Sequence, residues 1–245
     1  STLSRSAAGE RHLRQVIATN IDTVMVVCGL DGDFNPARIE RYFVLIEGSG
    51  AKAVVVLTKA DLAADAQALT DQLKARMPAG TEIHAINAKT GFGVDALLAH
   101  LGPGSSTVLV GSSGAGKSTL TNTLLGEARQ STQAVRANDS RGRHTTTYRS
   151  LIMLPSGGCL IDTPGMREVK LTGDESFDGG QFDDIEELAG ECRFGDCSHL
   201  AEPSCAVRAA LDDGRLDPER WHSYLKLRDE LAAAAESLEA QLRRK

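Results

Sequence analysis

The chain has 245 residues, of which 41% are hydrophobic, and its formal net charge is −6. This length allows one or two domains, and this apolar fraction is enough for a core. The acidic balance argues against a wholly basic nucleic-acid binder. Arginines gather in residues 1–20 and 129–149 and could dock on RNA, but charge alone favours an ordinary solvated surface there. The sequence shows neither a signal peptide nor an apolar run of membrane-spanning length, so we expect a cytoplasmic protein.

Short apolar strands alternate with amphipathic helices through the first half of the chain. The strands are expected at 23–28, 53–57, 82–86 and 105–110, and the helices at 36–47, 63–77, 94–101 and 118–125. This alternation predicts an α/β fold, a parallel sheet with helices on both faces. A hairpin is expected from 151–154 and 159–161. Ligands of such sheets bind where the strands end at their carboxyl side.

The strongest motif follows the strand at 105–110 and fits G-x-x-x-x-G-K-[ST], a phosphate-binding loop. Its glycines let backbone amides turn toward a phosphate chain at a helix amino end. Lys117 can reach the β- and γ-phosphates, and the Ser118 hydroxyl can bind Mg²⁺. One alternative is an ordinary glycine-rich turn. Another is the phosphate loop of a transporter-type ATPase, but such proteins carry a Leu-Ser-Gly-Gly-Gln signature, which residues 178–181 match only in part. The expected contacts are Gly111, Ser112, Ser113, Gly114, Ala115, Gly116, Lys117, Ser118 and Thr119.

Two further loops follow predicted strands and suit a guanine base. The Asp61 carboxylate can accept hydrogen bonds from the N1–H and the 2-amino group of guanine, a donor pair that adenine lacks. A backbone amide of the later loop could meet guanine O6. Thr-Lys-x-Asp also occurs as a chance helix cap, but two such loops beside a phosphate loop indicate a guanine site. Its residues are Thr58, Lys59, Ala60 and Asp61, with Asn87, Ala88 and Lys89.

After the hairpin comes Asp162-Thr-Pro-Gly165, which suits a phosphate switch. Asp162 can hold Mg²⁺ through water, and the Gly165 amide can reach a γ-phosphate. A threonine of the preceding segment, Thr145 or Thr146, can complete the magnesium shell. The motifs resemble those of a GTPase in rearranged order, because both base loops precede the phosphate loop. The chain is therefore similar to a circularly permuted P-loop GTPase.

Four soft ligands follow within a short stretch, in the pattern Cys-x₄-Cys-x-His-x₅-Cys. They suit tetrahedral Zn²⁺; the alternative is scattered core cysteines with a surface histidine. The two remaining cysteines of the five, Cys28 and Cys159, lie in apolar strands and are expected in the core. Asp217 and Pro218 should cap and start a helix that runs to the end of the chain. The expected zinc ligands are Cys192, Cys197, His199 and Cys205.

This combination resembles the RsgA/YjeQ family, and the resemblance covers the chain from about residue 15 to its end. It implies a GTPase that hydrolyses GTP to GDP, uses Mg²⁺ and one Zn²⁺, and is stimulated by the small (30S) ribosomal subunit late in its assembly. It also implies contact with rRNA and suits a monomer. The family usually has an N-terminal OB-fold, so we expect residues 1–20 to be the linker after it, 21–172 the GTPase domain and 173–245 a small, mainly helical zinc-binding domain.

The resemblance also assigns catalytic residues. The first-switch motif falls on His144, Thr145 and Thr146, and we assign Thr146 to magnesium. Met166 stands where many GTPases have a water-orienting Gln, so His144 is the candidate for that role. Lys117 and Thr146 are the other expected catalytic residues. His144 could instead be a plain polar loop residue. The rival interpretation of the whole chain is a GTP-responsive zinc- and RNA-binding module whose turnover is incidental.

Overall fold

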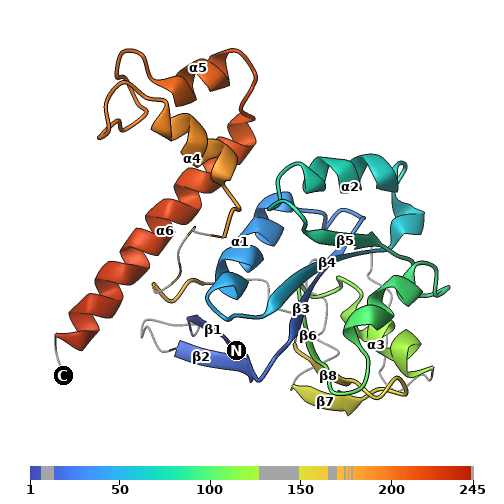
Figure 1. Ribbon diagram of the computed structural model, residues 1–245. Coiled ribbons are helices and arrows are strands. Elements are labelled where there is room, and N and C mark those ends of the chain that lie inside the picture. Colours follow the sequence, from blue (N-terminus) through green and yellow to red (C-terminus); the bar gives the residue numbers. More distant parts are fainter. Residues whose placement is uncertain are drawn as a thin grey trace.

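The chain folds around one six-stranded sheet, shown in a computed structural model that describes residues 1–6, 14–126, 149–164, 170–173, 175, 177 and 179–243 (Figure 1). The strand order is β5-β4-β3-β6-β8-β7, and only β7 is antiparallel to its neighbour. This confirms the expected α/β fold with a mainly parallel sheet. The strands are β3 Thr23–Gly29, β4 Lys52–Thr58, β5 Glu82–Ala85, β6 Ser106–Val110, β7 Ser150–Met153 and β8 Cys159–Asp162.

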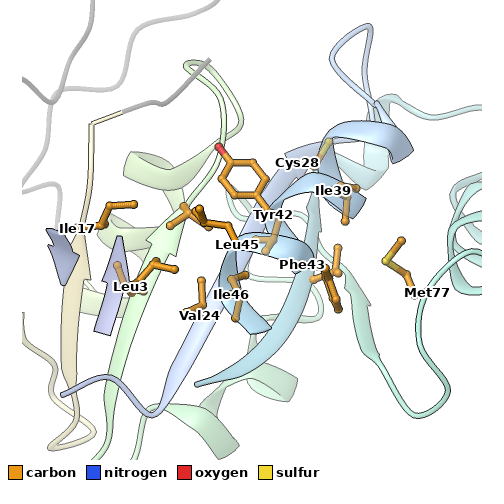
Figure 2. Packing of buried hydrophobic residues seen from close by; sticks show 14 of the residues in the cluster. Leu3, Ile17, Val24, Cys28, Ile39, Tyr42, Phe43, Leu45, Ile46 and Met77 are labelled. Atoms are coloured by element: carbon orange, nitrogen blue, oxygen red, sulfur yellow. The ribbon is translucent and has the colours of Figure 1, made fainter. Parts of the chain in front are cut away.

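Helices cover both faces of this sheet, so its central strands are buried on both sides. Every residue of β3 is buried, which explains why β3 reads as an unbroken apolar run rather than an alternating one. On one face, Figure 2 shows Tyr42, Phe43 and Ile46 of α1 among the buried side chains that include Val24 of β3. The other face carries η2 and α3. The helices are α1 Pro36–Glu47, η1 Ala60–Leu62, α2 Ala66–Lys74, η2 Val94–His100 and α3 Lys117–Leu125.

Two of the expected helices differ from the prediction. The helix expected at 63–77 begins only at Ala66, because the Asp65 side chain accepts a hydrogen bond from Ala68 N and caps it there. The segment expected as a helix at 94–101 is a 3₁₀-helix, η2. Its buried side chains, Val94 and Leu97, lie three positions apart, which matches the three residues per turn of a 3₁₀-helix.

The beginning of the chain is more structured than the expected linker. β1 Thr2–Ser6 and β2 Arg14–Thr19 pair antiparallel in a separate two-stranded sheet. Leu3 and Ile17 are buried in the same cluster as α1. Those two apolar side chains give the hairpin a hydrophobic face, which a short strand needs for stability in water.

The last third of the described chain is helical, with α4 Asp183–Gly190, α5 Ala206–Asp212 and α6 Pro218–Leu242. Asp217 Oδ1 accepts a hydrogen bond from Glu219 N at 2.8 Å, so α6 starts as predicted. Figure 1 shows α6 leading from α4 and α5 alongside α1, and Arg41 of α1 forms an ion pair with Glu230 of α6 at 2.8 Å. In the described part of the chain, no helix is long and apolar enough to cross a membrane.

A buried group of charges joins α6 to the sheet domain. Glu40 of α1 has no exposed side-chain surface and pairs with Arg76 and with Arg220, each at 2.8 Å. Arg220 also reaches Asp184 at 2.6 Å and donates to the Gln181 carbonyl at 2.7 Å. One guanidinium therefore connects α1, α4 and α6.

Candidate nucleotide and zinc sites

The phosphate loop leaves β6 through a position that only glycine can occupy. Gly111 has φ +148°, and a Cβ there would lie 2.2 Å from the carbonyl oxygen of Val27 on the neighbouring strand. Gly114 and Gly116 also have positive φ, at 83° and 95°. These values let the loop curl back before α3 starts at Lys117. The amino end of α3 thus faces the loop that precedes it, the arrangement that binds anions.

Lys117 places its ammonium group inside that loop. Its Nζ donates to the Gly111 carbonyl at 2.9 Å and to the Ser112 carbonyl at 2.7 Å, and the side chain is buried. Burial lowers the pKa of Lys117 to about 8, although the carboxylates of Asp162 and Asp33 favour its charged form. The loop therefore holds a desolvated cation at its centre, where the attraction for a phosphate is strong.

The first base loop packs directly on the phosphate loop. Thr58, at the end of β4, is buried, and its Oγ1 donates to the Ala115 carbonyl at 2.6 Å. A Cβ on Gly116 would lie 3.0 Å from the same hydroxyl. Threonine stands where many GTPases have asparagine, but the backbones approach closely enough for the shorter side chain to bridge them.

The two base loops also contact each other and α3. The amide of Ala60 donates to the Ile86 carbonyl at 3.1 Å, and the Thr123 hydroxyl of α3 donates to the Ala88 carbonyl. The Asn87 side chain accepts a hydrogen bond from Lys89 N at 2.9 Å and fixes the turn of the second loop. Asp61 lies on η1 and is exposed. Its carboxylate is accessible to a base.

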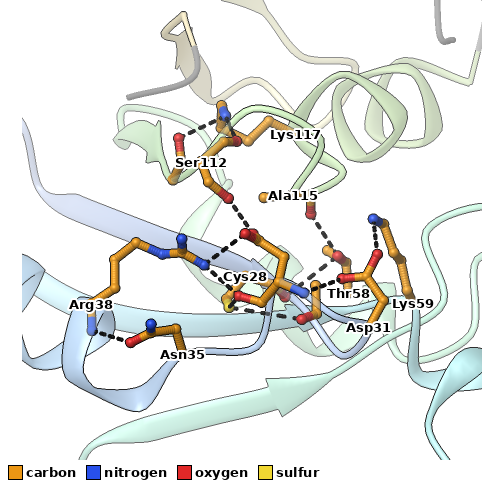
Figure 3. Close-up of polar contacts among 12 residues, drawn as sticks. Cys28, Asp31, Asn35, Arg38, Thr58, Lys59, Ser112, Ala115 and Lys117 are labelled. Carbon is orange, nitrogen blue, oxygen red and sulfur yellow. Dashed lines mark hydrogen bonds and ion pairs between the residues drawn. The ribbon is translucent and has the colours of Figure 1, made fainter. Parts of the chain in front are cut away.

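Sequence reasoning missed two acids in the loop between β3 and α1, Asp31 and Asp33. Figure 3 shows Asp31 beside Lys59 of the first base loop. Asp31 pairs with Lys59 at 2.5 Å, and Asp33 accepts a hydrogen bond from the Ser112 hydroxyl. Arg38 pairs with Asp33 at 2.9 Å. Asp-Gly-Asp at the carboxyl end of a central strand is the signal that could have pointed to them.

Asp162, the predicted magnesium ligand, ends β8 and is fully buried. It pairs in the sheet with Leu109 of β6, the strand that leads into the phosphate loop. A buried carboxylate at this edge of the sheet is a donor that suits Mg²⁺. His144, Thr145, Thr146, Gly165 and Met166 lie outside the described residues.

The four predicted zinc ligands come together, and each offers an atom within 4.8 Å of the others. Cys192 Sγ lies 3.9 Å from Cys205 Sγ, and His199 Nδ1 lies 3.6 Å from Cys192 Sγ and 3.5 Å from Cys205 Sγ. A tetrahedral zinc ion with ordinary bond lengths separates two sulfurs by about 3.8 Å, and a sulfur and a nitrogen by about 3.6 Å. The four side chains therefore fit Zn²⁺.

Local structure holds these ligands in place. His199 has φ +62°, and Glu202 fixes the loop that carries it by accepting hydrogen bonds from Ser198 N at 2.9 Å and Leu200 N at 3.1 Å. Hydrogen bonding to Ser198 lowers the pKa of Glu202 to about 2. Sequence reasoning did not single out Glu202. Cys205 precedes α5, and its Sγ accepts a hydrogen bond from Arg208 N at 3.5 Å, which orients the side chain.

The sheet order and the loops at its carboxyl edge define a circularly permuted P-loop GTPase domain, followed by a small helical segment with a zinc-type cluster. In sequence, the base loops precede the phosphate loop; in the sheet, β3 lies between β4 and β6. A family model described as RsgA GTPase matches residues 1–172, and the chain belongs to this family.

Similar proteins and solved structures support this family assignment. The chain is 61% identical over 241 residues to the small ribosomal subunit biogenesis GTPase RsgA of Xanthomonas euvesicatoria, with 97% of this chain and 66% of that protein covered. The protein of the same name from Xanthomonas oryzae is 60% identical over the same coverage. The crystal structure of YjeQ from Thermotoga maritima has a TM-score of 0.60 at 27% identity, covering 89% of this chain and 77% of that one. The crystal structure of YloQ, described as a circularly permuted GTPase, has a TM-score of 0.57 at 28% identity, covering 87% and 69%.

Proposed function

We propose that this protein hydrolyses GTP to GDP and phosphate with Mg²⁺, and that the small ribosomal subunit and its rRNA stimulate it during late subunit assembly in the cytoplasm. The chain spans 66% of the length of its Xanthomonas euvesicatoria relative, whose name supplies the link to the small subunit. We further propose that it acts as a monomer with a linker at 1–20, a GTPase domain at 21–172 and a zinc-binding domain at 173–245.

The contact between the base loop and the phosphate loop carries the proposal. A nucleotide must be held at both ends, and the Thr58–Ala115 hydrogen bond brings the two loops together. Asp61 would accept the two guanine donors, while the Lys59 stem lies along the purine. The amides of 111–119 would surround the phosphates, as the positive φ angles of Gly114 and Gly116 support.

The catalytic roles follow from this placement. Lys117 would exchange the two loop carbonyls for oxygens of the β- and γ-phosphates. Ser118, Asp162 and Thr146 would hold Mg²⁺, which when bound neutralises charge on the phosphate oxygens. Thr145 and the Gly165 amide would close on the γ-phosphate, and His144 would orient the attacking water. Cys192, Cys197, His199 and Cys205 would bind one structural Zn²⁺.

Base selectivity tests this function directly. Asp61→Asn replaces an acceptor pair with an amide, whose nitrogen faces the guanine donors but can donate to the extra carbonyl of xanthine. Losing two charged hydrogen bonds should weaken GTP binding about 100-fold and shift preference toward XTP. Asp65→Asn is the matched control, because Asp65 only caps α2. Unchanged GTP affinity in Asp61→Asn would refute the guanine assignment.

A further inference from the structure

A second group of metal-ligating side chains lies away from the nucleotide and zinc sites. Glu82 and His84 stand on β5, and His100 is the last residue of η2. Each offers an atom that lies within 4.8 Å of the other two. Glu82 and His84 are two residues apart on a strand and so share one face of the sheet. Glu82 starts β5, so the group lies toward the amino edge of the sheet, opposite the base loops.

The spacing of these atoms suits a metal ion. Glu82 Oε2 lies 2.9 Å from His100 Nε2 and 3.5 Å from His84 Nε2. Nitrogen and oxygen ligands of a tetrahedral zinc ion lie about 3.4 Å apart at ordinary bond lengths. His84 Nε2 is buried and has no hydrogen-bond partner among the described residues. A buried imidazole nitrogen without a hydrogen bond is costly, and a metal bond would satisfy it better than its 3.5 Å approach to the Glu82 carboxylate.

The neighbouring cation leaves room for a metal. Lys52 pairs with the other oxygen of the carboxylate, Glu82 Oε1, so Oε2 faces the two histidines. The Lys52 side chain is 52% exposed and can move into solvent. The arrangement of the Glu82 carboxylate therefore allows a divalent cation to bind.

We propose that Glu82, His84 and His100 form a second zinc site, with water in the remaining coordination position. Two histidines and a glutamate form a donor set that zinc uses in other proteins. The ion would tie η2 to β5, the edge strand of the sheet. Thr107 Oγ1 of β6 donates to the His100 carbonyl at 2.7 Å. The site would therefore fix η2, which connects the second base loop to β6, the strand before the phosphate loop. The circularly permuted order of the motifs makes this connection necessary.

Zinc stoichiometry tests the proposal. The full chain, already loaded at its cysteine cluster, is dialysed against micromolar Zn²⁺, and bound zinc is measured by mass spectrometry. The wild type should hold two ions per chain, and His84→Asn and His100→Asn one each. His222→Asn, at an exposed histidine of α6, should keep two. A single ion in the wild type, or a second ion that survives both substitutions, would overturn the site.

A variant with the opposite expected effect guards against damage to the fold. Lys52→Ala removes a cation that competes for the Glu82 carboxylate, so the second Zn²⁺ should bind several-fold more tightly. Calorimetric titration of the cysteine-loaded protein measures this change. Co²⁺ as a probe should give no thiolate charge-transfer band, because the site contains no sulfur. Weaker binding in Lys52→Ala, or a thiolate band on filling the second site, would contradict the ligand set.

Discussion

Replacing Arg220 by methionine should loosen the attachment of the zinc segment to the sheet domain. Arg220 is 7% exposed and donates to Glu40, Asp184 and the carbonyl of Gln181. Methionine fills most of the volume but leaves the Glu40 carboxylate, which is 0% exposed, with Arg76 alone. Breaking a buried pair in this way typically costs 3–5 kcal/mol, and because Arg76 remains we expect about 3 kcal/mol.

The single tryptophan makes this loss measurable, since Trp221 follows Arg220 and its ring lies 5.7 Å from that of His199. Urea unfolding of the zinc-loaded protein, followed by Trp221 emission, should show a midpoint lower by about 1 M at a slope near 3 kcal/mol per M. Arg208→Met is the matched control, because Arg208 is an exposed arginine of α5, and its midpoint should not move.

Two further results would separate the buried pair from a general packing defect. Glu40→Gln and Arg220→Met together should cost less than the sum of the single variants, by about 1–3 kcal/mol. Burial raises the pKa of Glu40 despite its two arginines, and losing Arg220 must raise it further. As the pH falls, native Arg220→Met therefore takes up a proton at Glu40 before the native wild type does. The difference in free energy of unfolding between the wild type and Arg220→Met should then shrink. If the free-energy costs of the two substitutions add and the stability loss of Arg220→Met does not change with pH, the buried ion pair is not the cause.

Three other predictions concern the two sites. Cys197→Ser should lose the cluster's zinc and change Trp221 emission, which metal analysis and fluorescence measure; unchanged zinc content would disprove the ligand. His144→Ala should keep GTP affinity and small-subunit binding but lose most of the stimulated rate of GTP hydrolysis. If that rate is unchanged, His144 does not orient the water, and a group of the ribosome is the better candidate. Because burial lowers the pKa of Lys117 to about 8, GTP binding to the free protein should weaken above that pH, by up to about tenfold per unit. A GTP affinity that stays constant from about pH 7.5 to about 9.5, on both sides of the Lys117 pKa of about 8, would contradict this.

The sequence predicted the elements whose signal is local. The strands of the central sheet are buried on both faces, so their apolar runs were visible without any partner. The phosphate loop and the cysteine cluster are compact motifs, because backbone geometry and metal coordination each fix a spacing. The 3₁₀ form of η2 was not predicted, because its large apolar residues, Val94, Leu97, Leu98 and Leu101, have the spacing of an α-helix.

Contacts between distant segments left no such signal. Asp33 meets Ser112 across 79 positions, and Arg220 meets Glu40 across 180. Asp-Gly-Asp at a strand end could mark Asp33 as a site residue but not name its partner, and nothing in the sequence distinguishes Glu40 from an exposed acid until the fold buries it. The hairpin of β1 and β2 was missed for a similar reason, since Leu3 and Ile17 become a core face only when α1 covers them.

Phosphate release from GTP by the purified chain is the decisive measurement of the proposed GTPase activity. It should be measured with and without small ribosomal subunits, beside Lys117→Ala, which removes the cation at the centre of the phosphate loop. We predict slow release by the wild type alone, a marked increase with small subunits, and neither in the variant. Equal release by the wild type and Lys117→Ala under both conditions would contradict it.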